Sequence, residues 1–472
     1  MPPRSHPDRS ALDAAFLRDV VSGGARLTPG QALELYHGMP LQELGRWADA
    51  RCRALHGDHV RTYVIDRNIN YTNVCTARCT FCAFRRDGDE DDAYTLSYDA
   101  LLEKIGELVA IGGTQILMQG GMNPDLPLEW YTDLLAAIKG RYPGVHVHAF
   151  SPPEFIEFVR FFDPPGESLR AKIAWVMARL REAGLDSVPG GGGEIFAPAV
   201  RRKIGLGKCD AEAWLTTMHI AHELGMNTSA TMMFGHIEGI ADRIHHFELV
   251  RQWQDRAIDD FAALGTGGGG GGGGGRYKAF IAWPFQRENT PLGRAKEWGQ
   301  GEGDDLSQPF PGDAVATLDG TGDKNDHPEF GRRVRQASAS DYLRTQALSR
   351  LYLDNIYSIG ASWVTMGPNI GQVALHYGAS DMGSVMMEEN VVSAAGTTYC
   401  LNEPTLCRLI RDAGFIPAQR NNEYNLLKLH DDDAAPDRLV SDWSSVRAQK
   451  LHIQEQPDPP PAVALTISGP AS

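Results

Sequence analysis

The stretch "RTYVIDRNINYTNVCTARCTFC", residues 61–82, joins a strand-like segment to a loop with three cysteines. Cys75, Cys79 and Cys82 lie within eight positions of a chain that has 7 cysteines in 472 residues. They are too close together for a disulfide framework, and one cysteine is missing for a closed four-thiolate metal site. The other cysteines are scattered, which is typical of small buried apolar side chains. We therefore expect this loop to carry the chemistry of the protein.

Strand-like and helix-like segments alternate along most of the chain after this loop. The segment "SYDALLEKIGELVAIG", for example, places Leu101, Ile105 and Leu108 on one face of a helix. Alternating strands and helices indicate parallel βαβ units. Eight strand candidates predict an α/β fold, a TIM-like (β/α) barrel, with a doubly wound open sheet as the alternative. The candidates are residues 61–73, 114–121, 145–154, 185–195, 226–236, 277–286, 358–367 and 383–392.

Polar and glycine-rich segments divide the chain into a barrel domain and flexible parts. We expect a flexible N-terminus over residues 1–30 and a barrel domain over residues 31–425. Residues 267–275 are nine consecutive glycines, which neither a helix nor a strand tolerates, so they predict a flexible loop. Residues 293–336 are polar and rich in glycine and proline, which predicts a disordered insertion. Residues 426–472 are expected to form a flexible C-terminal tail.

The composition argues against several classes of partner. The net charge is −15 and no long basic stripe is present, so we expect no nucleic-acid-binding surface. The first residues have no apolar core of a secretory signal, and no run of about 18 apolar residues occurs that a membrane-spanning helix needs. We therefore expect a cytoplasmic protein with reduced thiols, in which clustered cysteines serve metal or redox chemistry.

The spacing Cys-x-x-x-Cys-x-x-Cys places three thiolates on one short loop. Iron–sulfur clusters are held by cysteine thiolates, normally four. Three ligands leave one iron without a protein ligand, and an open coordination position is the usual mark of a catalytic metal. The alternative is a zinc site that borrows a fourth ligand from elsewhere, such as Cys52 or a histidine. Zinc sites more often show paired Cys-x-x-Cys units, and this chain has no second pair.

The motif "CTARCTFC", residues 75–82, resembles the signature of the radical S-adenosylmethionine (SAM) enzymes, with Phe81 as the aromatic residue before the last cysteine. That family carries its signature after the first strand of a β/α barrel, which is also its place here. The resemblance implies that Cys75, Cys79 and Cys82 ligate a [4Fe–4S] cluster with one open iron, which binds the amino and carboxylate groups of SAM. One-electron reduction would then cleave SAM to methionine and a 5′-deoxyadenosyl radical, which abstracts a hydrogen atom from the substrate.

Further motifs are similar to those of the cyclic dehypoxanthinyl futalosine synthases of the futalosine route to menaquinone. They include "LMQGG" (117–121), "HAFSPPE" (148–154), "SATMMFGH" (229–236) and "AFIAWPFQRENTPL" (279–292). The implied reaction is a radical cyclisation of dehypoxanthine futalosine. Hydrogen leaves the ribose 4′ carbon, the sugar radical adds to the benzoate ring, and loss of an electron and a proton restores aromaticity.

Two sister groups share this core and are the alternatives, the aminofutalosine synthases and the deazaflavin (FO) synthases. The alternative of a different class is a non-catalytic protein in which an iron–sulfur cluster or zinc is structural. The resemblance implies a small nucleoside substrate and an electron donor such as flavodoxin or ferredoxin. No nucleic acid and no membrane are expected as partners.

The resemblance also implies contacts to SAM after the second strand. Gln119, Gly120 and Gly121 close that strand, and glycines there let the backbone approach a ligand. In the family, the Gly–Gly motif contacts the SAM amino group. Met122 stands where the family commonly has an acidic residue, so a carboxylate contact from this position is not expected here.

Two further segments are expected beside SAM. By the resemblance, Phe81 and the backbone of Ala83 and Phe84 contact the adenine. Ser151 and Glu154 lie past the end of the third strand, where barrel enzymes bind ligands, and are expected to contact the SAM ribose or the substrate. The two prolines between them are predicted to fix a loop.

The base that removes the proton is left open among several side chains. Alternation places His146 and His148 on the same face of a strand, so both point into the barrel or both point away. His236 follows a strand, and histidine titrates near neutral pH. Glu389 is a carboxylate whose pKa an enclosed cavity would raise. The candidates are thus His148, His236, Glu389 and Glu154.

The benzoate of the implied substrate needs a cation or hydrogen-bond donors. Arg201, Arg202 and Lys203 follow the glycine-rich segment 189–195 and are candidates. A run of like charges is more often a solvated face, so these residues are not assigned to the site.

Overall fold

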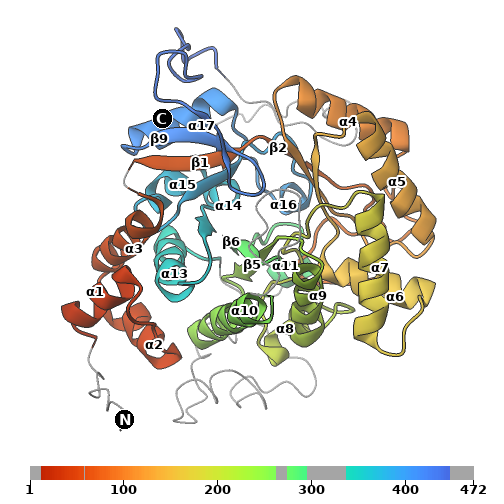
Figure 1. The fold of residues 1–472 in the computed structure, drawn as a ribbon, viewed down its shortest axis with the longest axis horizontal. Coiled ribbons are helices and arrows are strands. Elements are labelled where there is room, and N and C mark those ends of the chain that lie inside the picture. Colours follow the sequence, from red (N-terminus) through yellow and green to blue (C-terminus); the bar gives the residue numbers. More distant parts are fainter. Residues whose placement is uncertain (1–11, 58, 262–273, 295–335, 447–472) are drawn as a thin grey trace, which may run out of the picture.

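The computed structural model describes residues 12–57, 59–261, 274–294 and 336–446, which form a closed β/α barrel with helices on the outside (Figure 1). The strand order is β10-β9-β1-β8-β7-β6-β5 in one sheet and β2-β3-β4 in the other. The strands are β1 (Val60–Val64), β2 (Asp66–Ile69), β3 (Gln115–Met118), β4 (His146–Ala149), β5 (Thr228–Phe234), β6 (Tyr277–Pro284), β7 (Ser358–Gly360), β8 (Asp381–Ser384), β9 (Ile416–Arg420) and β10 (Leu426–Leu429).

Two isolated bridges join the two sheets into one barrel. The parallel bridge between His148 and Ser187 ties β4 to the following segment, and the bridge between Val188 and Thr228 ties that segment to β5. On the other side, β1 continues into β2 and pairs in parallel with β8. The order around the barrel is therefore β1/β2, β3, β4, residues 187–188, β5, β6, β7 and β8. Because these strands are parallel, their C-terminal ends meet at one end of the barrel, where such folds bind ligands.

The predicted barrel is confirmed, and seven of the eight predicted segments contain a strand of it, whereas the fourth, 185–195, contributes only the isolated bridges at Ser187 and Val188. Three predicted segments differ in extent. The seventh, 358–367, is a strand only over β7, and its second half forms the helical turn α14 (Trp363–Met366). The eighth, 383–392, is a strand only over β8, which begins at Asp381 and ends at Ser384, and the end of the predicted segment belongs to α16. The third ends at Ala149, because a helix begins at Pro152.

The helices pack their apolar faces against the barrel. In α4, the N-cap Ser97 accepts a hydrogen bond from the Ala100 N–H, and Leu101, Ile105 and Leu108 are buried as their spacing predicts. The helices are α1 (Ala14–Ser22), α2 (Pro29–Gly38), α3 (Leu41–His56), α4 (Tyr98–Ala110), α5 (Leu128–Arg141), α6 (Pro152–Phe162), α7 (Leu169–Ala183), α8 (Pro198–Ile204), α9 (Ala211–Glu223), α10 (Ile240–Asp260), α11 (Pro291–Arg294), α13 (Ala339–Tyr352), α14 (Trp363–Met366), α15 (Pro368–Ala374), α16 (Val391–Ala394) and α17 (Glu403–Asp412).

The N-terminal segment differs from the prediction of a flexible region over residues 1–30. Helix α1 lies inside this range, and its Phe16, Leu17 and Val20 are buried in the main apolar core. Asp13 caps the helix by accepting hydrogen bonds from two backbone N–H groups at 2.8 and 2.9 Å. The polar composition hid this short amphipathic helix, although an aspartate before an apolar stripe is a helix-start signal.

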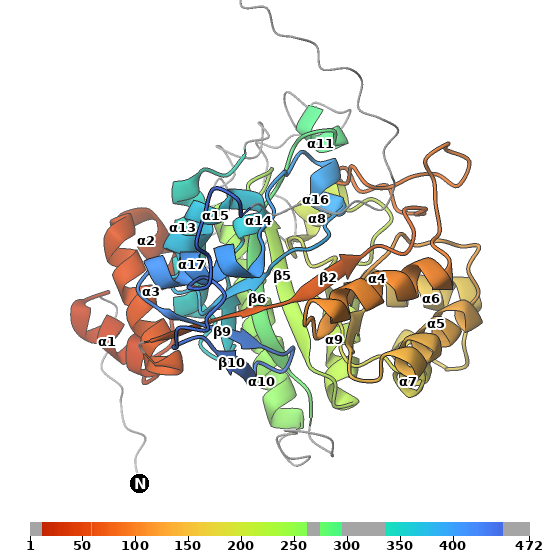
Figure 2. The same ribbon diagram turned by 90° about the horizontal axis from the view of Figure 1, so that it is seen from above.

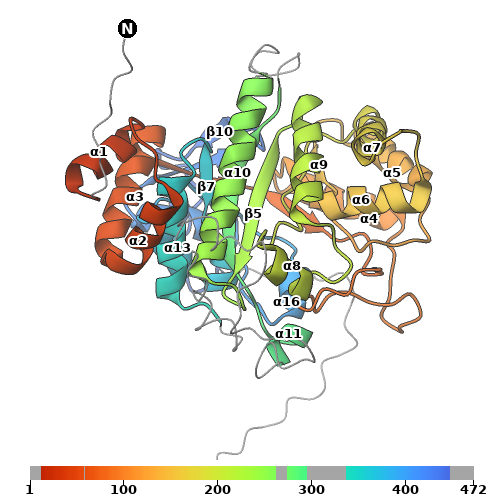
Figure 3. The ribbon, with the colours of Figure 1, turned by 90° about the horizontal axis from the view of Figure 1, so that it is seen from below.

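The C-terminal segment also contains structure where a tail was expected. Strand β10 pairs antiparallel with β9, outside the barrel. Figures 2 and 3 show β10 at one end of the molecule, and the short helices α8, α11 and α16 at the other. The predicted flexible insertions lie largely outside the described residues: all of the glycine run except Gly274 and Gly275, and most of 293–336. Within the described part of the chain, no helix is both long and apolar enough to cross a membrane.

Candidate active site

The cysteine loop follows β2 at the C-terminal end of the barrel. Cys75, Cys79 and Cys82 carry free thiols, and all three residues line one cavity inside the barrel. Cys79 is buried, whereas Cys75 and Cys82 are half-buried. They pack with Ala77 and Met122 in a small apolar cluster separate from the main core. The structure thus brings together the three residues that the sequence predicts as cluster ligands.

Backbone hydrogen bonds hold this loop against the segment that follows β3. The Thr76 N–H donates to the Met122 carbonyl at 3.0 Å, and the Gly121 N–H donates to the Thr72 carbonyl at 2.8 Å. A Cβ atom added to Gly121 would lie 2.1 Å from the Val74 carbonyl oxygen. Only a glycine lets the two backbones approach this closely.

Gly121→Ala should therefore displace the cysteine loop, because the added methyl group forces the backbone to move next to Cys75. We expect the apparent affinity for iron during cluster reconstitution to fall about tenfold or more, as measured by iron and sulfide bound per chain. Gly140→Ala is the matched control, since a Cβ added there meets no atom within 4 Å. Equal iron content in the two variants would show that the close approach does not shape the loop.

The donor set fits an iron–sulfur cluster. Burial raises the pKa of the Cys79 thiol to about 12; Lys208 lowers it, and Cys82 and Cys75 raise it. Thiolates this close together need cationic iron to offset their repulsion, and thiolate is the form that binds metal. Among the described residues, no three Cys, His, Asp or Glu side chains converge on a single ion, as tetrahedral zinc requires.

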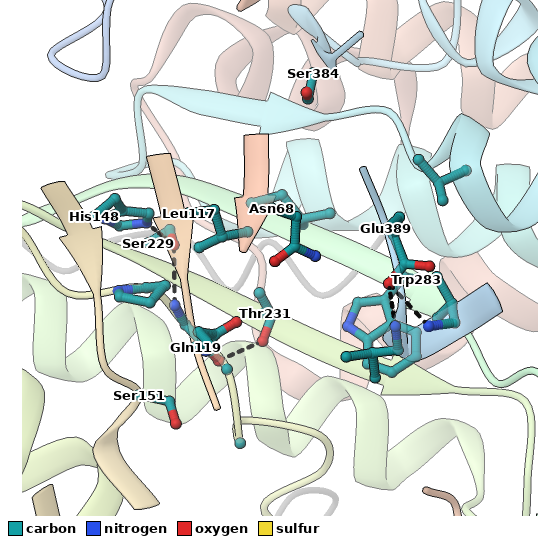
Figure 4. Close-up of a pocket in the computed structure, with 18 of the residues that line it drawn as sticks. Asn68, Leu117, Gln119, His148, Ser151, Ser229, Thr231, Trp283, Ser384 and Glu389 are labelled. Carbon is teal, nitrogen blue, oxygen red and sulfur yellow. Dashed lines mark hydrogen bonds between the residues drawn. The ribbon is translucent and has the colours of Figure 1, made fainter. Parts of the chain in front are cut away.

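One cavity of about 480 Å³ extends from the cysteine loop into the barrel. Figure 4 shows His148, Gln119 and Thr231, from different strands and strand ends, around this space. All the parallel strands contribute lining residues, so the substrate side of the site is the barrel interior itself.

The turn after β9 closes the opposite end of the barrel. Asn422 lies on the cavity wall, and its amide nitrogen is 2.9 Å from His146 Nε2 at the start of β4. Its neighbour Glu423 accepts a hydrogen bond from Asn227, just before β5. The cavity is therefore bounded by the cysteine loop at one end and by this turn at the other.

Ser151 and Glu154 line the cavity, but the loop predicted around them is wrong. They are the N-cap and the third residue of α6, and the two prolines between them form its first turn. Proline is tolerated there because the first N–H groups of a helix have no intrahelical partner. The pattern Ser-x-x-Glu is a capping box, a signal present in the sequence.

The carboxylate of Glu154 organises this side of the cavity. It accepts hydrogen bonds from Tyr71 Oη at 2.7 Å, from Gly120 N–H at 3.2 Å, and from the N–H and hydroxyl of Ser151, both at 2.6 Å. Burial raises the pKa of Glu154, and the hydrogen bonds from Ser151, Tyr71 and Gly120 oppose that shift. Glu154 therefore ties the end of β3 to the start of α6.

Gln119, Gly120 and Gly121 also line the cavity. A Cβ at Gly120 would lie 2.4 Å from the ring of Tyr71. Close packing against Tyr71 and Val74 alone therefore explains why residues 120 and 121 are both glycine. Their predicted contact with SAM stays a proposal.

Of the three residues expected to contact the adenine, two line the cavity and one does not. Phe81 and Phe84 line the cavity, whereas Ala83 does not. The Ala83 carbonyl accepts a hydrogen bond from Arg86 at 3.1 Å. The Lys208 ammonium lies over the Phe81 ring, 5.1 Å from its centroid.

Besides Glu154, two of the predicted proton acceptors line the cavity, His148 and Glu389. His148 is 7% exposed, and its pKa is lowered to about 3, mainly by burial and further by His146 and Arg420. The Glu389 carboxylate accepts hydrogen bonds from the N–H groups of the first three residues of α16, Val391, Val392 and Ser393, at 2.8–2.9 Å. Glu389 thus stabilises a helix start, and its lone pairs are already engaged there (Figure 4).

The prediction for His236 needs correction. It is fully buried and does not line the cavity. Its Nδ1 accepts the Ile237 N–H at 2.8 Å and lies 3.0 Å from Glu238, and its Nε2 contacts the Met233 carbonyl at 3.2 Å. Both ring nitrogens are occupied by protein atoms, and burial lowers the pKa of the ring. Its position after a strand did not reveal that the ring turns into the protein.

Several charged residues of the site were missed by the sequence reasoning, and two of them form a pair beside the cysteine loop. Glu194 and Lys208 line the cavity and form a salt bridge of 2.8 Å. Glu194 Oε2 is buried without a hydrogen-bond partner among the described residues. No local pattern distinguishes Lys208, but Glu194 ends the glycine-rich segment that follows the fourth strand, a position that points to the site.

The remaining alternatives have structural roles. Arg201 is buried and donates to the carbonyls of Gly192 and Gly193 at 2.9 and 3.0 Å, so it holds the glycine-rich segment and is no solvated charge. Cys52 is buried in α3, with its thiol 3.6 Å from the Ala379 carbonyl, and does not line the cavity. It is therefore not placed to be the fourth ligand of a zinc site.

Comparisons with known proteins agree with this geometry. Two family models match the chain, "Radical SAM superfamily" over residues 69–250 and "CofH/MqnC C-terminal region" over residues 327–432. The cyclic dehypoxanthine futalosine synthase of Halalkalibacterium halodurans is 37% identical over 428 residues, 91% of this chain and 98% of the relative. That of Streptomyces coelicolor is 37% identical over 440 residues, 92% of this chain and 94% of the relative.

A sister enzyme and a solved structure are also similar. The aminodeoxyfutalosine synthase of Thermus thermophilus is 33% identical over 417 residues, 88% of this chain and 96% of the relative. The crystal structure of methylornithine synthase superposes with a TM-score of 0.55 at 16% identity, and covers 85% of this chain and 97% of that one. At this identity, the likeness shows the shared fold.

Proposed function

Because this chain belongs to the radical SAM superfamily and, within it, to the family of cyclic dehypoxanthine futalosine synthases, we propose that it converts dehypoxanthine futalosine to cyclic dehypoxanthinyl futalosine in menaquinone biosynthesis. The observation that carries the proposal is the position of the three cysteines at one end of a closed barrel cavity of about 480 Å³. A cavity of this size lies in the range of small-molecule sites. A purely structural cluster would need no such cavity beside it.

The cysteine loop is proposed to hold the cofactors. Cys75, Cys79 and Cys82 would bind a [4Fe–4S] cluster whose fourth iron carries SAM, and this pair supplies the radical that takes hydrogen from the ribose 4′ carbon. The protein must then position SAM and substrate and keep water and other hydrogen donors away from the radical.

The side chains nearest the loop are proposed to position SAM. Phe81 and Phe84 offer ring surfaces for the adenine, while Gln119 and Ser151 offer polar groups for the ribose and the methionine part. Glu154 is saturated with protein donors, so we assign it the task of fixing Ser151 and the end of β3.

The barrel interior is proposed to bind the nucleoside. Asn68 Oδ1 and Gln115 Oε1 are buried without a hydrogen-bond partner among the described residues, although both residues line the cavity. Unpaired buried acceptors are costly, and hydroxyl groups of a ribose would satisfy them. Among the described residues, Lys278 lines the cavity without a salt bridge, whereas Arg85, Lys208 and Arg420 pair with acids, so Lys278 suits the benzoate carboxylate.

The sister reactions are the competing assignments, and the electron donor is a further proposal. The identity of 33% to an aminodeoxyfutalosine synthase over most of the chain keeps that reaction as the alternative. The single electron that starts each turnover is proposed to come from a donor of the flavodoxin or ferredoxin class.

The test is an anaerobic assay of the reconstituted protein with SAM, dithionite and dehypoxanthine futalosine. We expect 5′-deoxyadenosine together with a nucleoside that is two hydrogens lighter than the substrate, both measured by mass spectrometry. Deoxyadenosine without this product would move the assignment to a sister reaction. If neither compound forms from a protein with full iron content, the cluster is structural and the proposal is wrong.

A further inference from the structure

The cyclisation proposed above releases one proton for each ring that closes, and the barrel contains a hydrogen-bonded path for it. We propose that His148 accepts this proton from the substrate and passes it through Ser187 to His146, at the N-terminal end of the barrel. The inference rests on the proposed function and adds the proton's destination, which the family assignment leaves open.

Short contacts connect the three side chains. His148 Nδ1 lies 2.6 Å from Ser187 Oγ, and His146 Nε2 lies 2.7 Å from the same oxygen. A hydroxyl between two imidazoles can accept a proton from one and donate its own to the other. The strand register produces this arrangement, because His148 and Ser187 are bridge partners and His146 lies two residues earlier on the same face of β4.

The hydrogen bonds at the cavity end set the direction of transfer. Ser229 Oγ accepts the Gly190 N–H at 3.0 Å and lies 3.4 Å from His148 Nε2 (Figure 4). The Ser229 hydroxyl is therefore free to donate toward Nε2, which favours the tautomer with its proton on Nδ1, toward Ser187. In this tautomer the lone pair of Nε2 is engaged only by the long 3.4 Å contact to Ser229, so it can still accept a proton from a substrate in the cavity.

The far end of the path is at the barrel closure. His146 is half-buried, and Asn422 of the closing turn contacts it at 2.9 Å and Ser187 at 3.1 Å. Asp186 and Lys139 face His146, and Arg420 faces His148. The exit thus lies at the opposite end of the barrel from the cysteine loop, so the proton can leave without opening the radical site to water.

Both imidazoles have a low pKa, so they suit transient transfer of a proton and would not retain it at neutral pH. Burial lowers the pKa of His148 to about 3 and that of His146 to about 4. At neutral pH each ring is therefore neutral and passes on an accepted proton. The ring-closed radical can lose its proton to such a weak base because the unpaired electron leaves with it, and the two losses together restore an aromatic ring.

The C–H bond at the attacked ring carbon breaks, its proton goes to His148 Nε2, and its electron pair re-enters the ring. The one unpaired electron leaves to an acceptor of the iron–sulfur class. Arrival at Nε2 releases the Nδ1 proton to Ser187, whose own hydroxyl proton goes to His146 Nε2.

The other acids of the cavity are less suited. Asp66 accepts hydrogen bonds from Ser384 and from Gln115 Nε2. Glu154 and Glu389 accept several hydrogen bonds from protein donors. Asp381 is held by Arg420 at 2.6 and 2.9 Å. Glu194 is paired with Lys208 beside the cysteine loop.

The test compares Ser187→Ala, His146→Gln and the wild-type protein under the assay conditions above. Because hydrogen abstraction precedes proton loss, both variants should still form deoxyadenosine at a rate within about twofold of wild type. The cyclised product per deoxyadenosine should fall about tenfold or more, as is usual when general base catalysis is lost. Freeze-quench electron paramagnetic resonance should show the ring-closed radical accumulating, a signal that a loss of packing alone would not produce.

His222→Gln is the matched control. His222 is also a buried histidine with a hydroxyl partner, Thr228 Oγ1 at 2.7 Å, but it does not line the cavity. Its coupling of product to deoxyadenosine should equal that of wild type. Normal coupling in Ser187→Ala, or the same loss of coupling in His222→Gln, would overturn the relay. Absence of deoxyadenosine in the wild-type protein would instead overturn the proposed function.

Discussion

Cys79→Ala should abolish cleavage of SAM. The thiolate of Cys79 is one of the three proposed to hold the cluster, and it is the most buried of them, so water would not replace it easily. Ligands that act as one unit lose nearly all function when one is removed. We expect deoxyadenosine formation below about 1% of wild type, with iron and sulfide per chain reduced in parallel. Anaerobic reconstitution followed by iron analysis and the deoxyadenosine assay measures both.

Cys52→Ala is the control for this experiment. Cys52 is buried in α3, away from the cavity, and its loss should cost only about 1 kcal/mol of stability, as small core truncations do. The variant should keep its iron and its deoxyadenosine formation. If Cys52→Ala lost the cluster, a closed four-thiolate site would replace the open-iron interpretation.

Glu154→Ala should have the second-largest effect, on stability and on SAM binding together. Its carboxylate satisfies Tyr71, the Gly120 N–H and both polar groups of Ser151. Each buried donor left unpaired costs about 1–3 kcal/mol, so we expect a loss of about 3 kcal/mol or more. The end of β3 would be released at the same time, and we expect the Kd for SAM to rise about tenfold. Thermal unfolding and equilibrium dialysis measure the two effects.

Glu157→Ala supplies the matched variant on the same helix. Glu157 is 3% exposed, but its salt bridge is to the exposed Arg160 at 2.8 Å and it does not line the cavity. It should bind SAM with wild-type affinity. A Glu154→Ala protein that unfolds earlier yet binds SAM normally would reduce Glu154 to a helix cap without a role in the site.

Much of the fold could be predicted because its signals are local. The alternation of strands and helices and the spacing of the cysteines are properties of short segments, and both led to the observed barrel. The misjudged segments show where local signals compete. "SPPE" contains prolines typical of a loop and also a capping box, and the capping box prevailed because α6 buries Phe155 and Phe158 in the core.

The candidate site was predicted less completely than the fold. Cavity-lining side chains such as His148 and Ser151 follow from strand ends and strand alternation. His236 also follows the end of a strand, yet its ring turns into the protein toward Glu238 and does not reach the cavity. The neighbours Met233, Ile237 and Glu238 hold the ring there, but only the tertiary structure shows that this inward orientation is adopted.

The sequence by itself determined the cysteine loop, the parallel barrel and the family, because these depend on residue types a few positions apart. Only the tertiary structure decided which polar groups meet inside the barrel. Ser187 reaches His148 and His146, which lie 39 and 41 residues away, and the closing turn reaches His146 across 276 residues. Such contacts depend on strand register and barrel closure, which are set by the packing of the whole chain.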